Sequence, residues 1–157
     1  MADILKGRMT ADLDREVVVF LIGMRINHFW NVNHWWPVAT AMPRMIRELS
    51  ANPELGFLHA ESWFGRTTIM LQYWQSFDHL EAYAKSGDHA HLPAWAAFNR
   101  NATGNGSVGI WHETYRARPG NFEAIYTNMP PFGMARATRL IEASGKRDSA
   151  RQRMNAA

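Results

Sequence analysis

The sequence predicts an α+β fold of the ferredoxin-like kind, with split βαβ units, an antiparallel sheet and helices on one face of that sheet. The first observation is the apolar, β-branched stretch Glu16–Ile26, which is typical of a strand. The second is a pair of short strands, Gly56–Phe64 and Thr67–Gln75, joined by a tight turn as in a hairpin. The third is that helical spacing follows the first strand at Val38–Leu49 and follows the hairpin at Ser76–Gly87.

The first strand runs into an unusual segment, Asn27–Pro37, that holds three Trp, two His and three Asn. We expect this segment to be a loop, with a helix beginning near Val38. That helix has Ala39, Met42, Met45, Ile46 and Leu49 at helical spacing, and Pro43 either kinks it or lies close to its start. Ser76 is expected to cap the second helix and Gly87 to end it.

A helix, a glycine-containing turn and a strand follow in the stretch from Asp88 to Tyr115. Pro93 suits the first turn of a helix, and the turn residues of Asn99–Gly106 end it. Alternation from Val108 onward then predicts the last strand of the sheet.

Length and composition predict one folded domain with two looser ends. We expect a flexible arm at 1–15, a single ferredoxin-like domain at 16–133 and a basic helical or disordered tail at 134–157. The formal net charge is +3, whereas Arg136–Arg153 alone holds six Lys/Arg and two Asp/Glu, or +4, which leaves −1 for the rest. A near-neutral body does not indicate a nucleic-acid partner.

Several classes of protein are not supported by the sequence. The absence of Cys excludes a disulfide scaffold, a thiolate metal site and a cysteine nucleophile, and it favours a cytoplasmic location. The longest apolar run, Val17–Met24, is too short for a membrane span, and we expect no membrane partner. Dinucleotide fingerprints, phosphate loops and serine-elbow motifs are missing too.

A homodimer is predicted from the first strand. Its residues are apolar on both faces, and helices cover only one face of the sheet. The simplest cover for the second face is the same face of another copy.

Two histidines are the first candidates for chemistry. His91 lies at the start of a helix, where it is either a general base, an axial haem ligand or a structural residue. His112 lies on the strand face of Val108 and Ile110, so we expect it to be buried and paired. The spacing of His89 and His91 occurs in some metal sites, but without a carboxylate-rich partner set we expect no metal.

Polar residues on the strands are further candidates. Arg25 and Asn27 are placed to hold an anionic substrate group, or Arg25 pairs instead with Glu61 or Glu113. Glu113 needs a partner among its apolar neighbours, because a buried unpaired carboxylate is costly.

Four segments in fixed order carry a resemblance to a known family: QYWQSFDHLEAYA, HLPAWAAF, VGIWHETY and FEAIYTNMPPFG. The chain resembles small proteins similar to the fungal monooxygenase of fumagillin biosynthesis, from about Val17 to about Ala135. The resemblance implies a dimeric α/β barrel with a pocket between each sheet and its own helices. Related families of that fold include cofactor-free monooxygenases and haem enzymes.

The sequence and the resemblance together predict a monooxygenase-like oxidoreductase acting on a hydrophobic small molecule. We expect its pocket to be walled by Tyr73, Trp74, Trp95 and Trp111. No cofactor is predicted: a histidine base, His91, forms a carbanion that reacts with dioxygen, and Arg25 or Asn27 steadies it. The alternatives are a haem b enzyme with His91 as ligand, or a non-catalytic binder of haem or a small ligand.

Overall fold

The computed structural model of the chain describes residues 3–101, 104 and 106–156. Its main sheet has four antiparallel strands in the order β3-β4-β2-β5. The strands are β2 (Val17–Ile26), β3 (Phe57–Trp63), β4 (Ile69–Trp74) and β5 (Val108–Ala117). This order and the intervening helices confirm the predicted ferredoxin-like α+β fold.

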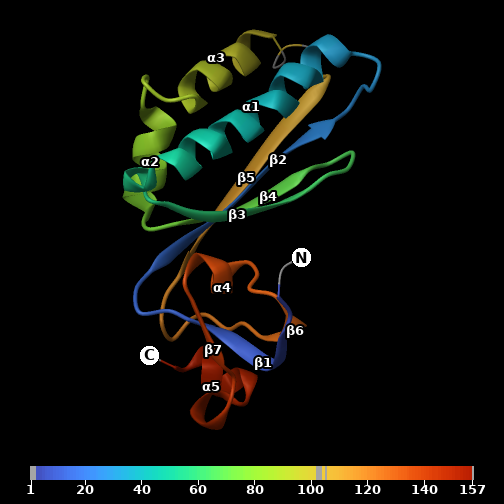
Figure 1. The fold of residues 1–157 in the computed structure, drawn as a ribbon. Helices are drawn as coiled ribbons and strands as arrows, with labels where there is room; N and C mark the ends of the chain where they lie inside the picture. The colour runs from blue at the N-terminus through green and yellow to red at the C-terminus, as the bar shows by residue number, and fades with distance from the viewer. Residues whose placement is uncertain (1–2, 102–103, 105, 157) are drawn as a thin grey trace.

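Three helices lie on one face of this sheet (Figure 1). They are α1 (Val32–Ala51), α2 (Phe77–Lys85) and α3 (His91–Asn101), and a short 3-10 turn η1 (Pro53–Leu55) follows α1. The hydroxyl of Ser76 accepts a hydrogen bond from the His79 N–H at 3.2 Å, so the predicted cap of α2 is confirmed.

Helix α1 begins earlier than predicted. Residues 32–37 are its first turns and not part of a loop, and both Pro37 and Pro43 lie inside the helix. A buried cluster of the sheet is packed against Trp35, Val38 and Ala39. The apolar face of the helix therefore begins before Pro37, and its burial stabilises the helical turns there.

Alternation along β2 divides the core in two. Val18, Phe20 and Met24 face the helices, and the cluster around Val18 includes Leu49, Trp74, Leu80 and Tyr83. Val17 and Val19 face the other way, into a second cluster with Tyr73, Ala117 and Met134. Both faces of β2 are therefore covered by other parts of the protein, which explains why the strand is apolar on both.

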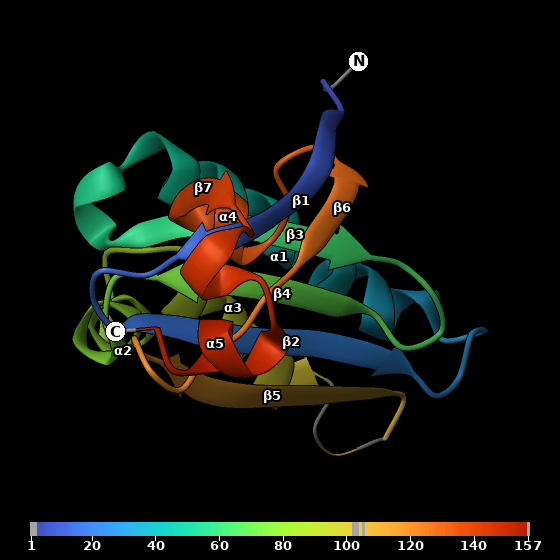
Figure 2. The ribbon, with the colours of Figure 1, turned by 90° about the horizontal axis from the view of Figure 1, so that it is seen from below.

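A second, smaller sheet supplies the cover on the far face. Its strands are β1 (Leu5–Asp12), β6 (Tyr126–Met129) and β7 (Arg139–Glu142), in the order β6-β1-β7. The short helices α4 (Met134–Ala137), η2 (Gly145–Arg147) and α5 (Ala150–Met154) accompany it. Figure 2 shows this unit across the middle of the main sheet, with the Ile26 end of β2 left uncovered.

The prediction that the arm and the tail lie outside the folded domain is thus wrong, although the tail does contain the predicted helical turns, in α4 and α5. Residues 5–12 pair with both 126–129 and 139–142, so the two ends of the chain build one sheet. The small sheet therefore covers part of the second face of the main sheet, so a partner subunit is not needed there. The reason is burial of apolar surface, because a short apolar patch packs on Val17 and Tyr73; it consists of Ala11, Met134, Ala135 and Leu140.

The end of the tail docks through one arginine. Arg153 is only 7% exposed. Its Nε donates to the Glu123 carboxylate at 2.8 Å, and its Nη1 donates to the carbonyls of Arg147 and Asp148 at 3.0 and 2.7 Å. A capping box between Ser149 and Gln152 starts the helix that carries it.

Among the residues that the structure describes, no helix has both the length and the apolar character needed to cross a bilayer.

We predict that Arg153→Met destabilises the protein by about 1.5–3 kcal/mol, because a buried ion pair and two carbonyls lose their donor. The melting temperature should fall by roughly 3–12 °C. Arg151→Met is the matched control, since Arg151 is exposed on the same helix. Equal melting temperatures for the two variants would show that the tail does not dock.

Candidate functional site

The sheet separates the predicted site residues into two groups. Tyr73 and Trp74 are neighbours on β4, so they point to opposite faces. Tyr73 is buried under the small sheet, and Trp74 is buried under α2. Trp111 lies on the same face as Tyr73. The prediction that these residues wall one pocket is therefore wrong.

Trp74 is part of the core on the helix-facing side of the sheet and does not reach the surface there. It is fully buried below Phe57 and Tyr83, with ring centroids 5.5 and 5.8 Å apart. Its Nε1 donates to Gln72 Oε1 at 3.0 Å, and Gln72 is itself buried. A substrate cannot reach this indole without displacing Tyr83.

His112 is exposed, and the prediction that it is buried and paired is wrong. It is on the helix-facing side of β5, opposite Ile22, as its alternation with Val108 and Ile110 requires. Its ring lies 5.7 Å from that of Phe20, and among the described residues it has no hydrogen bond or ion pair. The helices leave this edge of the sheet uncovered, so the imidazole faces solvent beside apolar side chains.

A polar cluster at the junction of the three helices surrounds Glu48. Its carboxylate accepts hydrogen bonds from the Tyr83 hydroxyl at 2.8 Å and the Ala90 N–H at 3.0 Å, and it lies 3.1 Å from His89 Nδ1. We call Glu48, Tyr83, His89 and His91 the Glu48 cluster. The rings of His89 and His91 both pack on Tyr83, at 5.3 and 6.2 Å.

The electrostatics of this cluster follow from those contacts. Burial alone would raise the pKa of Glu48, but the Ala90 N–H, the Tyr83 hydroxyl and His89 together lower it below its ordinary value. Burial and the neighbouring Glu48 carboxylate raise the pKa of Tyr83. At neutral pH the cluster therefore holds one carboxylate and one phenol.

His91 has a defined tautomer. Its Nδ1 lies 2.9 Å from the Ala84 carbonyl oxygen, which can only accept, so Nδ1 carries the hydrogen. In the neutral ring Nε2 is then left with a lone pair. This is the form that a general base or a metal ligand requires.

The face of α3 that carries His91 also carries Trp95 and Phe98, at the i, i+4 and i+7 positions. Phe98 packs against Met24, Ile26 and Val108 of the sheet, so this face turns toward the helix-facing side. Trp95 stacks on Phe98 with centroids 5.6 Å apart and is partly exposed. His91, Trp95 and His112 thus border the same side of the sheet.

Arg25, Trp111 and Glu113 lie on the opposite face. Arg25 donates to the Thr67 hydroxyl at 2.9 Å, and Glu113 accepts from the Tyr115 hydroxyl, so the alternative of an Arg25 ion pair with Glu61 or Glu113 is not seen. Trp111 crosses Gly23, where a Cβ would come within 2.6 Å of its Nε1. Asn27 lies beyond the strand end and donates to the Gly106 carbonyl at 2.9 Å.

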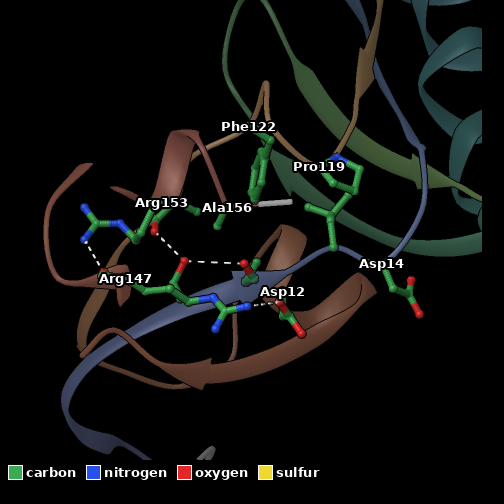
Figure 3. Close-up of a pocket in the computed structure, with 11 residues that line it drawn as sticks. Asp12, Asp14, Pro119, Phe122, Arg147, Arg153 and Ala156 are labelled. Atoms are coloured by element: carbon green, nitrogen blue, oxygen red, sulfur yellow. Dashed lines mark hydrogen bonds and ion pairs between the residues drawn. The ribbon is translucent and has the colours of Figure 1, made fainter. Parts of the chain in front are cut away.

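A cavity of about 250 Å³ lies elsewhere, between the small sheet and α5. Figure 3 shows the Arg147 side chain turned toward Asp12, whereas Asp14 points away from both, and Asp12 is paired with both Arg139 and Arg147. Arg139 is the principal cause of the lowered pKa of Asp12. The predicted site residues do not line this cavity.

The described residues hold no group of three or more His, Cys, Asp or Glu placed to bind a metal ion.

Sequence reasoning missed Glu48 and Tyr83, and it considered His89 only as a possible metal ligand. As a charged residue of an amphipathic helix, Glu48 is expected on the outer side, but it points to the start of α3. Its position next to Leu49 and one turn after Met45, both buried, is the signal that could have found it.

The fold and the site define a small ferredoxin-like α+β protein whose third helix carries an imidazole over the sheet. The family model described as Monooxygenase af470-like matches residues 17–134, and the chain belongs to this family. This confirms the resemblance found in the four sequence segments. Strands β1 and β7 lie outside the matched range.

The chain is also similar to the curated protein Monooxygenase af470 of Aspergillus fumigatus. The two are 27% identical over 169 residues, which cover 94% of this chain and 59% of that protein. The chain therefore spans less than two thirds of the length of this relative.

Solved structures give weaker likenesses. SnoaB, a cofactor-independent oxygenase from Streptomyces nogalater, is 14% identical with a TM-score of 0.47, covering 66% of this chain and 94% of that one. A dimeric ferredoxin-like protein of unknown function from Jannaschia is 16% identical with a TM-score of 0.43, covering 62% and 97%.

We predict that Tyr83→Phe lowers the free energy of unfolding by about 1.5–3 kcal/mol at pH 7, because Glu48 loses a buried donor. The pKa of Glu48 is lowered by folding, so this stabilisation is present above the ordinary value of 4.5 and is lost as pH falls through the lower folded value. Urea titrations at pH 7 and at successively lower pH measure it.

The control is Tyr115→Phe, which removes a similar hydroxyl–carboxylate pair from an exposed tyrosine. It should change stability little at any pH. If both variants behave alike, the Glu48 cluster contributes nothing beyond a surface contact.

Proposed function

We propose that the chain is a monooxygenase-like enzyme that binds a hydrophobic small molecule on the helix-facing side of β2 and β5. Membership of the Monooxygenase af470-like family supports oxidation as the class of reaction. The surface is apolar where Phe20, Ile22 and Ile110 lie, and it is only partly covered by helices. Trp95 and Phe98 of α3 border it with aromatic rings.

The observation that carries the proposal is the tautomer of His91. Its Nδ1–H is held by the Ala84 carbonyl, which orients the ring and leaves Nε2 as the acceptor. In the proposed role His91 removes a proton from an activated CH₂ of the substrate. The carbanion then reacts with dioxygen, one oxygen atom enters the substrate as a carbonyl, and the other leaves as water.

The proposed roles of the other predicted residues change accordingly. Arg25 lies on the opposite face, so it does not steady the anion, and Asn27 is held by Gly106. His112 is the second imidazole of the helix-facing side and remains the alternative base. His112 is paired with Ile22 of β2, and Trp74 is paired with Val18, four residues earlier on the same strand. The two positions are therefore about 13 Å apart along the strand direction.

A haem-dependent reaction is the second candidate, and the same imidazole favours it. A histidine whose Nδ1 donates to a carbonyl presents Nε2 in the way that metal-ligating histidines do. His91 would then be the residue that holds the iron, and the haem would supply the oxidising chemistry. A Soret band in the purified protein that disappears in His91→Ala would favour this candidate over the cofactor-free one.

We predict that His91→Ala lowers kcat/KM by roughly 10²-fold or more, whereas the melting temperature falls only by the few degrees expected for loss of the part-buried hydrogen bond to Ala84. A suitable probe is anthrone, because its CH₂ lies between aryl rings and its carbanion is delocalised. Oxygen uptake is compared with buffer alone. His59→Ala is the control imidazole, since His59 pairs with Glu61 on the opposite face and should keep full activity.

Three outcomes bear on this assignment. Loss of activity in His112→Ala but not in His91→Ala would make the strand histidine the base. Unchanged activity in both would remove the base from this side of the sheet. Absence of any acceleration by the unaltered protein, with no Soret band, would leave a non-catalytic binder.

We also propose a homodimer through the part of the far face that the small sheet leaves open. Leu21 and Ile69 are half-buried there, and Trp63 and Tyr115 are 44% and 53% exposed. A second copy placed over this area would remove these side chains from water.

Light scattering at micromolar concentration should give about twice 18.0 kDa. Tyr115→Lys should shift the mass toward the monomer. Thr114→Lys is the matched control, because Thr114 is exposed but points to the helix side. A monomeric, well-folded unaltered protein would refute the dimer.

A further inference from the structure

We propose that one end of the molecule binds the surface of an anionic lipid bilayer. This end, which we call the aromatic tip, consists of Phe29, Trp30, Trp36, Phe64 and Arg66. It joins the loop after β2, the first turns of α1 and the turn between β3 and β4. Figures 1 and 2 both show the loop after β2 and the β3–β4 turn at the same end of the main sheet.

The exposure of the tip is large. Trp30 is 89% exposed and Phe64 is 86% exposed, although these are among the most apolar side chains of the chain. Phe29 and Trp36 are about half exposed. Single exposed apolar side chains are ordinary, but four exposed aromatic rings on segments that meet at one end of the sheet indicate an interaction surface.

The two loops of the tip are tied together. The Arg66 guanidinium lies over the Phe29 ring at 5.7 Å, and its Nε donates to the Ile26 carbonyl at 3.2 Å. From the other side, Trp35 Nε1 donates to the Phe29 carbonyl at 3.0 Å. The rings are therefore presented by a fixed frame, which lowers the entropy lost on binding.

The charge of the tip identifies the partner. Arg25, His28, His34 and Arg66 lie in or beside it, and residues 25–37, 62–67 and 106–112 contain no Asp or Glu. A symmetric contact between two tips would bring like charges together, which disfavours a second copy as occupant. An anionic bilayer complements the arginines, and Trp is favoured at the level of the lipid headgroups.

The association would be peripheral. In the described part of the chain no helix can span a membrane, and the tip uses two loops and only the first turns of α1. The sequence predicted no membrane partner because it offered no apolar span. Surface binding needs instead a few exposed rings and basic residues on separate segments, which only the fold brings together.

The test is cosedimentation of the full chain with vesicles of phosphatidylcholine alone or mixed with phosphatidylserine. We expect binding to the mixed vesicles that weakens as salt is added. The double variant Trp30→Ala/Phe64→Ala should lower the partition coefficient roughly tenfold or more. The control is Ile4→Ala/Met154→Ala, which removes two exposed apolar side chains from the small-sheet unit and should bind as the unaltered protein does.

Arg66→Gln provides a second variant. It should weaken binding to mixed vesicles and leave any binding to neutral vesicles unchanged. The proposal is overturned if the unaltered protein does not sediment with mixed vesicles, or if the double variant binds equally well. It is also overturned if the double variant halves the mass in light scattering without lipid, because the tip would then be a contact between copies.

Discussion

The structure depends on one strand that is buried on both of its faces. Val17 and Val18 of β2 are both almost inaccessible to water, and they belong to different cores. Burying large apolar side chains contributes about 1.5–3 kcal/mol each, so neither face of this strand can be left open at its buried end. The helices cover the apolar side chains of one face, and the small sheet covers those of the other.

This constraint also decides where chemistry can occur. At the Val17 end of β2 both faces are closed, and Trp74 and Tyr73 serve there as packing. Toward the other end the helix-facing side opens, and the imidazole of His112 lies beside Phe20 at an edge of the sheet. The Glu48 cluster lies over the closed end, where Tyr83 packs on Trp74, and it ties the start of α3, with His91, to α1 and α2.

The strands and the second helix could be predicted because their signals are local: alternation in β5, a hairpin turn and the Ser76 cap. The candidate site could be predicted only in part, because it depends on the direction in which each side chain points and on what covers it. Alternation already separates Tyr73 from Trp74, but no local rule shows that Glu48 turns inward or that His112 stays uncovered. The small sheet was missed because β6 and β7 have only four residues each, and because their common partner β1 lies more than a hundred residues away in the chain.

That distance along the chain has a kinetic consequence. Met9 of β1 pairs with Tyr126 and Glu142, so the first strand gains no partner until nearly the whole polypeptide is available. Closing such long loops is slow, whereas the β3–β4 hairpin forms from neighbouring residues. The main sheet should therefore form first and expose its second face until the two ends of the chain meet. During that interval, the face around Val17 and Tyr73 is the surface most prone to aggregation.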